Sequence, residues 1–179
     1  MAEPSPVDRL YQEAIDIIGA LGSGEPSLTI AAGDSFRKAL VLAAASHFEH
    51  RVCGCVTEFV GEISQGNRLV VSLVVNKAVS RQYHTWFSWT DTNANQFFGL
   101  FGAEFKQLMV ERVKQSEELK ESIRAFLEIG NERNKLAHQD FASFPLEKTL
   151  DEIYAMYKRA LLFVSSLPDF LRQVKAKAT

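Results

Sequence analysis

Three residues in one short segment have side chains suited to proton transfer beside an anion: Arg133, Asn134 and His138. A histidine imidazole gains and loses a proton near neutral pH, so it can act as acid or base. A guanidinium stays charged and binds anionic oxygens through a planar fork. On a helix Asn134 and His138 would lie about 40° apart, whereas Arg133 would lie about 140° from His138. A shared site therefore requires Arg133 to reach with its long side chain, or the helix to loosen near His138.

The same residues also allow a structural interpretation. Arg133 could form a surface ion pair with a nearby carboxylate such as Glu132. Asn134 and His138 could instead cap a helix end, where a protonated histidine favours the negative end of the helix dipole. Residue types and spacing alone leave both interpretations open.

Helical periodicity runs through most of the chain, and it predicts an all-α fold, an up-and-down helical bundle with a helical or mixed insertion in the middle. We expect a first helix from Pro6 to Leu21 and a second from an Asp34 N-cap to about Ile63. Residues 69–79 are valine-rich and fit either a strand or a helix, and we interpret them as helix. The phenylalanines of residues 97–101 are expected to fill the core.

The motif segment is predicted to lie at the end of a long helix over residues 119–137. A loop at residues 141–145 follows, and Pro145 suits the first turn of a final helix. We expect Pro168 to end or kink that helix. Residues 168–179 would form a small basic tail, and the core would span about residues 34–167 of a single domain over residues 1–179.

Composition excludes several classes of protein. The 179 residues include 20 Lys and Arg against 22 Asp and Glu, and 46% are hydrophobic. Such a chain is neither disordered over most of its length nor a strongly basic nucleic-acid coat. No apolar run approaches the roughly 20 residues of a membrane span, and the first residues do not resemble a secretory signal. Cys53 and Cys55 form neither a disulfide framework nor a zinc site by themselves. We therefore expect a cytoplasmic protein without metal or cofactor.

The segment from Arg133 to His138 resembles the signature of the HEPN superfamily, in which an arginine is followed by a polar residue, often asparagine, and then by a histidine. The surroundings are similar too, because an alanine-rich helix at residues 36–49 precedes the motif and an amphipathic helix follows it. The resemblance covers about residues 34–167.

This resemblance implies a HEPN-like fold and a metal-independent endoribonuclease that forms a homodimer, so that two motifs face one composite site. Such domains act as toxins or as effectors of antiviral defence, which implies RNA as substrate and an antitoxin or defence-system protein as partner. His138 and Arg133 would carry the chemistry, and Asn134 would orient His138 or bind phosphate. Glu49, on the alanine-rich helix, would hold Arg133, although it could equally be a solvated carboxylate.

Lys135 and Arg124 are the predicted substrate contacts. The basic residues of this region alternate with glutamates, which predicts a mixed, solvated face and modest affinity for free RNA. Two other functions remain open: a non-catalytic HEPN-like interaction or dimerisation module, and a nucleotide-binding protein.

Overall fold

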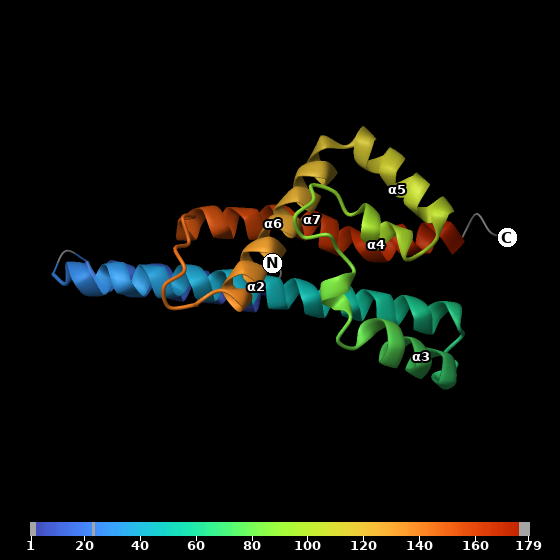
Figure 1. Ribbon diagram of the computed structural model, residues 1–179, viewed down its shortest axis with the longest axis horizontal. Coiled ribbons are helices and arrows are strands. Elements are labelled where there is room, and N and C mark those ends of the chain that lie inside the picture. Colours follow the sequence, from blue (N-terminus) through green and yellow to red (C-terminus); the bar gives the residue numbers. More distant parts are fainter. Residues whose placement is uncertain (1–2, 23, 176–179) are drawn as a thin grey trace. The chain divides into compact units, whose positions relative to one another are not determined.

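The computed structural model describes residues 3–22 and 24–175 (Figure 1), and within these residues all regular structure is helical. The elements are α1 (Pro6–Leu21), α2 (Pro26–Ile63), α3 (Arg68–Val74), a π-helix (Val75–Val79), a 3₁₀ turn (Tyr83–Thr85), α4 (Asn95–Gly99), α5 (Ala103–Gln115), α6 (Glu117–His138) and α7 (Leu150–Lys175). The prediction of an all-α fold is confirmed, and the middle segment is helical.

The chain divides into two compact units, which we call the first and the second unit. The first unit comprises Met1–His47 and Ile129–Lys158, and the second comprises Phe48–Glu128 and Arg159–Thr179. Three long helices, α2, α6 and α7, contribute residues to both. The motif segment belongs to the first unit.

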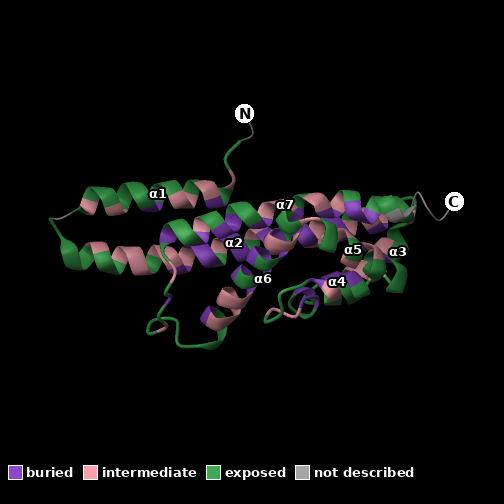
Figure 2. Ribbon diagram, turned by 90° about the horizontal axis from the view of Figure 1, so that it is seen from above, coloured by how far each residue is buried: buried purple, intermediate pink, exposed green. Residues whose placement is uncertain are grey.

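Polar and aromatic contacts fasten α1 to the start of α7 in the first unit. Figure 2 shows that most of α1 is exposed or half-buried, and Val7 and Ala14 are its buried residues. The rings of Tyr11 and Tyr154 stack with centroids 3.8 Å apart. The hydroxyl group of Tyr154 donates a 2.8 Å hydrogen bond to Asp8 Oδ1. Because α1 buries so little apolar surface, these contacts contribute much of the free energy that holds α1 against α7.

Asp8 also belongs to the capping box of α1. Its backbone N–H donates to Ser5 Oγ at 3.1 Å, and its Oδ2 accepts from the Ser5 backbone N–H at 2.8 Å. Burial raises the pKa of this carboxyl, but hydrogen bonds from Tyr154, Ser5 and Lys158 outweigh burial and lower the pKa to about 2. The ionised carboxylate therefore stabilises the folded first unit.

An aromatic cluster forms the core of the second unit. Phe87 stacks on Phe97 at 4.8 Å and meets Phe126 edge-on at 4.9 Å, and Phe126 lies 5.1 Å from Phe163. Ser122 is fully buried here, and its hydroxyl oxygen accepts a 2.8 Å hydrogen bond from the Phe163 backbone N–H. The phenylalanine-rich middle of the chain thus fills the core, as expected.

Three helix boundaries differ from the sequence prediction. α2 begins at Pro26, so Asp34 lies inside the helix and is not its N-cap. α7 begins at Leu150 and not at Pro145, because Thr149 and Glu152 form a capping box at Leu150. Thr149 Oγ1 accepts a hydrogen bond from the Glu152 N–H at 3.2 Å, and Glu152 Oε2 accepts one from the Thr149 N–H at 2.7 Å. Pro168 lies inside α7, which continues to Lys175, so residues 168–175 of the predicted tail are helical. A kink at Pro168 remains a prediction.

The valine-rich segment is helical, as predicted, but it changes helix type. After α3 the chain forms a π-helix over Val75–Val79, and the Ser80 N–H donates to the Val75 carbonyl at 2.7 Å. Residues 176–179 of the predicted basic tail lie outside the described residues. Among the described helices, none is both long and apolar enough to cross a bilayer.

Replacing Asp8 by Asn should lower the free energy of unfolding by about 2 kcal/mol at pH 7, since the carboxylate loses its charge-dependent partners. The folded-state pKa lies below the unfolded value near 3.8, so this contribution is present above pH 4 and is lost as the pH falls towards 2. Urea unfolding of both proteins between pH 2 and pH 7 measures the difference.

The exposed Glu13 of α1 provides the control, because Glu13→Gln should change stability by less than about 0.5 kcal/mol. A difference between the wild type and Asp8→Asn that stays constant from pH 7 to pH 2 would contradict the proposed role of the carboxylate.

Candidate active site

The last turns of α6 are anchored by apolar residues on one face. Ile129 and Leu136 are 1% and 3% exposed, and seven positions separate them, so they lie on the same side of the helix. The helix is regular to its end, since the Gln139 N–H donates to the Lys135 carbonyl at 3.0 Å. The helix therefore does not loosen before His138, and Arg133 must reach round it.

Arg133 reaches towards the neighbouring residue of the motif. Its Nη1 donates a 3.1 Å hydrogen bond to Asn134 Oδ1, and both residues are half-buried. Helical spacing places Asn134 on the same face as His138, which is exposed. The bond holds the guanidinium beside the face that carries the imidazole. The three motif residues are thus brought to one end of α6, with the imidazole open to solvent.

A polar pocket of about 400 Å³ flanks this helix end. It is lined by Glu132, Lys135, Gln139 and residues 144–148. Lys135 lies three residues before His138, about 60° away around the helix. Its Nζ pairs with Glu132 Oε1 at 2.8 Å. The predicted substrate contact Lys135 therefore lies near the imidazole, but its charge is balanced by a carboxylate.

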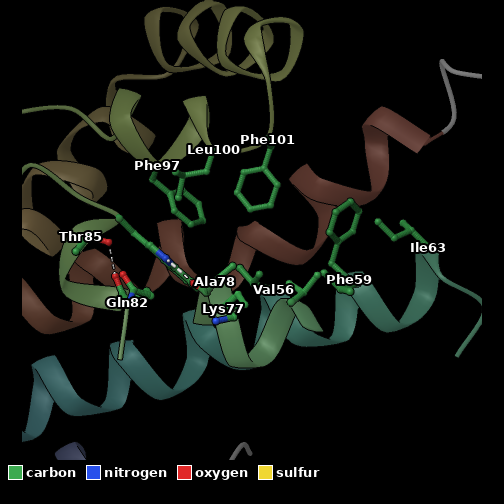
Figure 3. A pocket seen from close by; sticks show the side chains of 13 residues that line it. Val56, Phe59, Ile63, Lys77, Ala78, Gln82, Thr85, Phe97, Leu100 and Phe101 are labelled. Carbon is green, nitrogen blue, oxygen red and sulfur yellow. Dashed lines mark hydrogen bonds between the residues drawn. The ribbon is translucent and has the colours of Figure 1, made fainter. Parts of the chain in front are cut away.

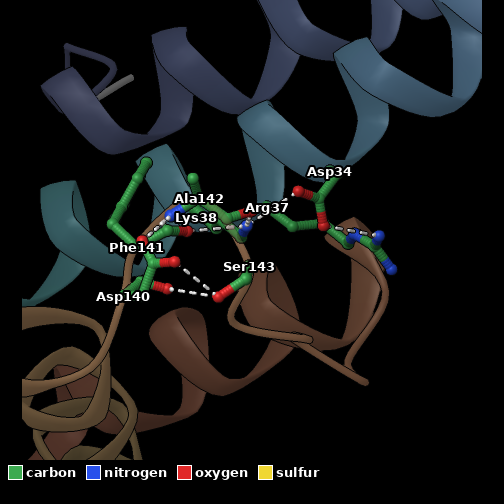
Figure 4. A network of polar contacts seen from close by, with 7 residues as sticks. All are labelled: Asp34, Arg37, Lys38, Asp140, Phe141, Ala142 and Ser143. Atoms are coloured by element: carbon green, nitrogen blue, oxygen red, sulfur yellow. Dashed lines mark hydrogen bonds and ion pairs between the residues drawn. The ribbon is translucent and has the colours of Figure 1, made fainter.

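A buried lysine fixes the loop that follows His138, and it was not among the predicted site residues. Lys38 of α2 is 2% exposed. Its Nζ donates to the carbonyl oxygens of Phe141 and Ala142 at 3.0 and 3.4 Å, and it lies over the Phe141 ring at 5.3 Å (Figure 4). These bonds begin three residues after His138, so Lys38 ties the end of the motif helix to α2.

The charge of Lys38 is matched by Asp34, one helical turn earlier. Lys38 Nζ lies 2.8 Å from Asp34 Oδ2, and Arg37 Nη2 lies 3.2 Å from Oδ1 of the same carboxylate. The hydrogen bond from Lys38 outweighs burial and lowers the pKa of Asp34. The four-residue spacing of Asp34 and Lys38 could have indicated this ion pair from the sequence. The same residues, however, also fit a helix N-cap at Asp34 and an ordinary surface ion pair.

Asp140 organises the start of the same loop. Its Oδ1 accepts from the Ala142 backbone N–H at 3.2 Å, and its Oδ2 accepts from the Ser143 hydroxyl group at 2.8 Å. This is an Asx-type turn directly after the motif, and Figure 4 shows it facing the Lys38 contacts. The loop is therefore held from within by Asp140 and from α2 by Lys38.

The family model described as RiboL-PSP-HEPN matches residues 9–173. The chain belongs to this HEPN family. No curated protein and no solved structure matches it. The match extends well beyond the region expected from the motif and includes most of α1, most of α7 and the helical middle segment.

The remaining predicted site residues of the HEPN chain lie in the second unit. Glu49 is half-buried on α2. Burial raises the pKa of the Cys53 thiol to about 11, and the charge of Glu49 adds to this effect. Its support of Arg133 remains a prediction. Arg124 pairs with Glu121 on the exposed side of α6. Its contact with substrate also remains a prediction.

Four cations on α5 and α6 of the HEPN chain are paired with glutamates three positions earlier. Lys114 pairs with Glu111 at 2.8 Å, and Lys120 pairs with Glu117 at 3.0 Å. The same spacing joins Arg124 to Glu121 and Lys135 to Glu132. The expected mixed, solvated face is therefore present. Within the described residues, no group of three or more histidine, cysteine, aspartate or glutamate side chains is arranged to hold a metal ion.

Replacing Lys38 by Met should free the loop after the motif, because two carbonyl oxygens and one carboxylate lose a buried cation. We expect a loss of about 2–3 kcal/mol in the free energy of unfolding and faster amide hydrogen exchange at residues 141–144. Denaturant unfolding and exchange mass spectrometry measure the two effects.

Lys120→Met removes an equivalent but exposed ion pair and should change stability by no more than about 0.5 kcal/mol. If the two variants are equally stable and exchange alike, Lys38 does not anchor the loop.

Proposed function

We propose that this HEPN domain is a metal-independent endoribonuclease that acts as a homodimer, with a composite site formed by the motifs of two copies. The proposal is carried by one observation: the Arg133 guanidinium is bonded to Asn134 at 3.1 Å beside the face that carries the exposed His138. Membership of the HEPN family supports the same interpretation.

The chemistry needs no group beyond this chain and its substrate. A base removes the proton from a ribose 2′-hydroxyl group, and the 2′-oxygen attacks the adjacent phosphorus. The bond from phosphorus to the 5′-oxygen breaks, and an acid protonates that leaving oxygen. The products are a 2′,3′-cyclic phosphate and a 5′-hydroxyl end. Positive charge beside the phosphorane stabilises the transition state.

The residues at the end of α6 suit these roles. His138 is open to solvent, so RNA can reach its imidazole. The planar guanidinium of Arg133 can bind two phosphate oxygens through its fork. Asn134 positions the guanidinium through its side-chain oxygen. In a symmetric dimer two imidazoles would be present, so one copy of His138 can act as the base while the other acts as the acid.

The charge pairing also bears on how substrate is bound. Four basic residues of α5 and α6 are paired with glutamates, which weakens their attraction for phosphates. We therefore propose modest affinity for free RNA and a protein partner, an antitoxin or a defence-system component, that controls access to the site.

His138→Ala should reduce RNA cleavage by at least about a hundredfold, because it removes the groups that transfer protons. Wild-type protein should cleave RNA in excess chelator and leave 2′,3′-cyclic phosphate ends. Gel assays with end-group analysis measure both, and circular dichroism with light scattering shows that fold and mass are retained.

His84→Ala is the matched control, because His84 is another exposed histidine outside the motif. Its cleavage activity should equal that of the wild type. Failure of wild-type protein to cleave any RNA would favour the non-catalytic module, and tight binding of a mononucleotide without turnover would favour the nucleotide-binding protein.

A mixed dimer tests the composite site directly. A doubly tagged dimer of one wild-type and one His138→Ala chain should have as little activity as the variant homodimer, since base and acid come from different copies. Tandem affinity purification isolates this species for the same cleavage assay.

The corresponding mixed dimer with His84→Ala should keep full activity. If the dimer with His138→Ala keeps about half of the wild-type activity, each copy acts alone and the composite site is wrong, although the ribonuclease activity itself would stand.

A further inference from the structure

The second unit contains an apolar pocket that the proposed reaction does not use. Its volume is about 460 Å³, within the range of small-molecule sites. Figure 3 shows its wall, which comes from the last turns of α2, the π-helix, the 3₁₀ turn and α4. Aromatic rings supply much of the lining, among them Phe59, Trp86, Phe97 and Phe101.

Several polar groups of this wall are satisfied by hydrogen bonds within the protein. The Trp86 indole N–H donates to the Ala78 carbonyl at 3.0 Å, and Trp86 is 5% exposed. The Thr85 hydroxyl group donates to the Gln82 carbonyl at 2.7 Å, and the Thr85 carbonyl accepts from Gln96 Nε2 at 2.6 Å. The wall is therefore fixed in place, and it presents mainly hydrocarbon to the cavity.

Two polar side chains remain among the lining residues without such bonds. Lys77 and Gln82 are exposed, and no described carboxylate pairs with the Lys77 ammonium group. Lys77 belongs to the π-helix Val75–Val79. Short π-helices occur often at functional sites, so this is a second observation, independent of the cavity, that points to binding.

These features select one class of ligand. An apolar cavity penalises nucleotides and other highly polar molecules, because their polar groups would lose hydrogen bonds to water. One unpaired ammonium group at the edge favours a single negative charge, and the Gln82 amide can donate to the same oxygens. We propose that this pocket binds an amphipathic monocarboxylate, with its hydrocarbon chain against the aromatic wall and its carboxylate on Lys77 and Gln82.

The probe is decanoate, kept below the concentration at which it forms micelles, and decanol is the uncharged comparison. Calorimetry and tryptophan fluorescence should show saturable binding of one decanoate per chain. Lys77→Met should weaken decanoate binding about tenfold, and decanol binding should change less than about twofold. Ala78→Phe, which fills the cavity, should abolish binding of both.

Lys106→Met is the matched control, since it removes an exposed lysine of α5 that does not line the pocket. Equal weakening by Lys77→Met and Lys106→Met would overturn the carboxylate assignment. Binding that survives Ala78→Phe, or no saturable binding at all, would overturn the site. The protein could instead self-associate through the pocket, and Leu69→Ser, on the exposed face of α3, would then abolish that association. Such a result would assign the pocket to a second copy of the chain. None of these measurements depends on RNA cleavage.

Discussion

The hydrogen bond from Arg133 to Asn134 is the interaction on which the candidate active site depends. In a regular α-helix the residues at positions 133 and 138 diverge by about 140°, so helix geometry alone separates guanidinium from imidazole. The side-chain oxygen of Asn134 offsets that separation, because it accepts from Arg133 at 3.1 Å and belongs to the face of His138. An asparagine suits this position, since its neutral carbonyl binds the guanidinium without neutralising its charge.

The helix end that carries this bond requires its own support. The last carbonyl groups of a helix lack partners within the helix, and His138 at this end is exposed. Support comes from Lys38, whose buried ammonium group binds the loop carbonyls after the motif and is balanced by Asp34. A buried cation is costly unless it is well paired, so this arrangement favours one conformation of the loop. The loop is held while the imidazole stays open to solvent.

The sequence predicted the helices and the motif because both depend on local spacing. Helix boundaries were less certain, because one residue type can serve several purposes. Asp34 has the side chain of an N-cap, yet it pairs with Lys38 inside α2. Pro145 suits a first turn, but the capping box of Thr149 and Glu152, also visible in the sequence, sets the start of α7. The contact of Lys38 with Phe141 joins positions 103 residues apart, and no local pattern reports it.

The ion pairs on the surface of α5 and α6 affect how strongly this surface would attract RNA. A ribonuclease must attract a polyanion, but strong attraction would hold RNA wherever cations are dense. In the described part of α5 and α6, glutamates balance Lys114, Lys120, Arg124 and Lys135 through ion pairs of helical spacing. Arg133 also has a neutral acceptor, because its Nη1 is bonded to the Asn134 amide oxygen. If the domain cleaves RNA as proposed, a phosphate would have to compete with a carboxylate for each of these four cations. In the proposed ribonuclease, this pairing of the surrounding cations would weaken RNA binding away from the motif.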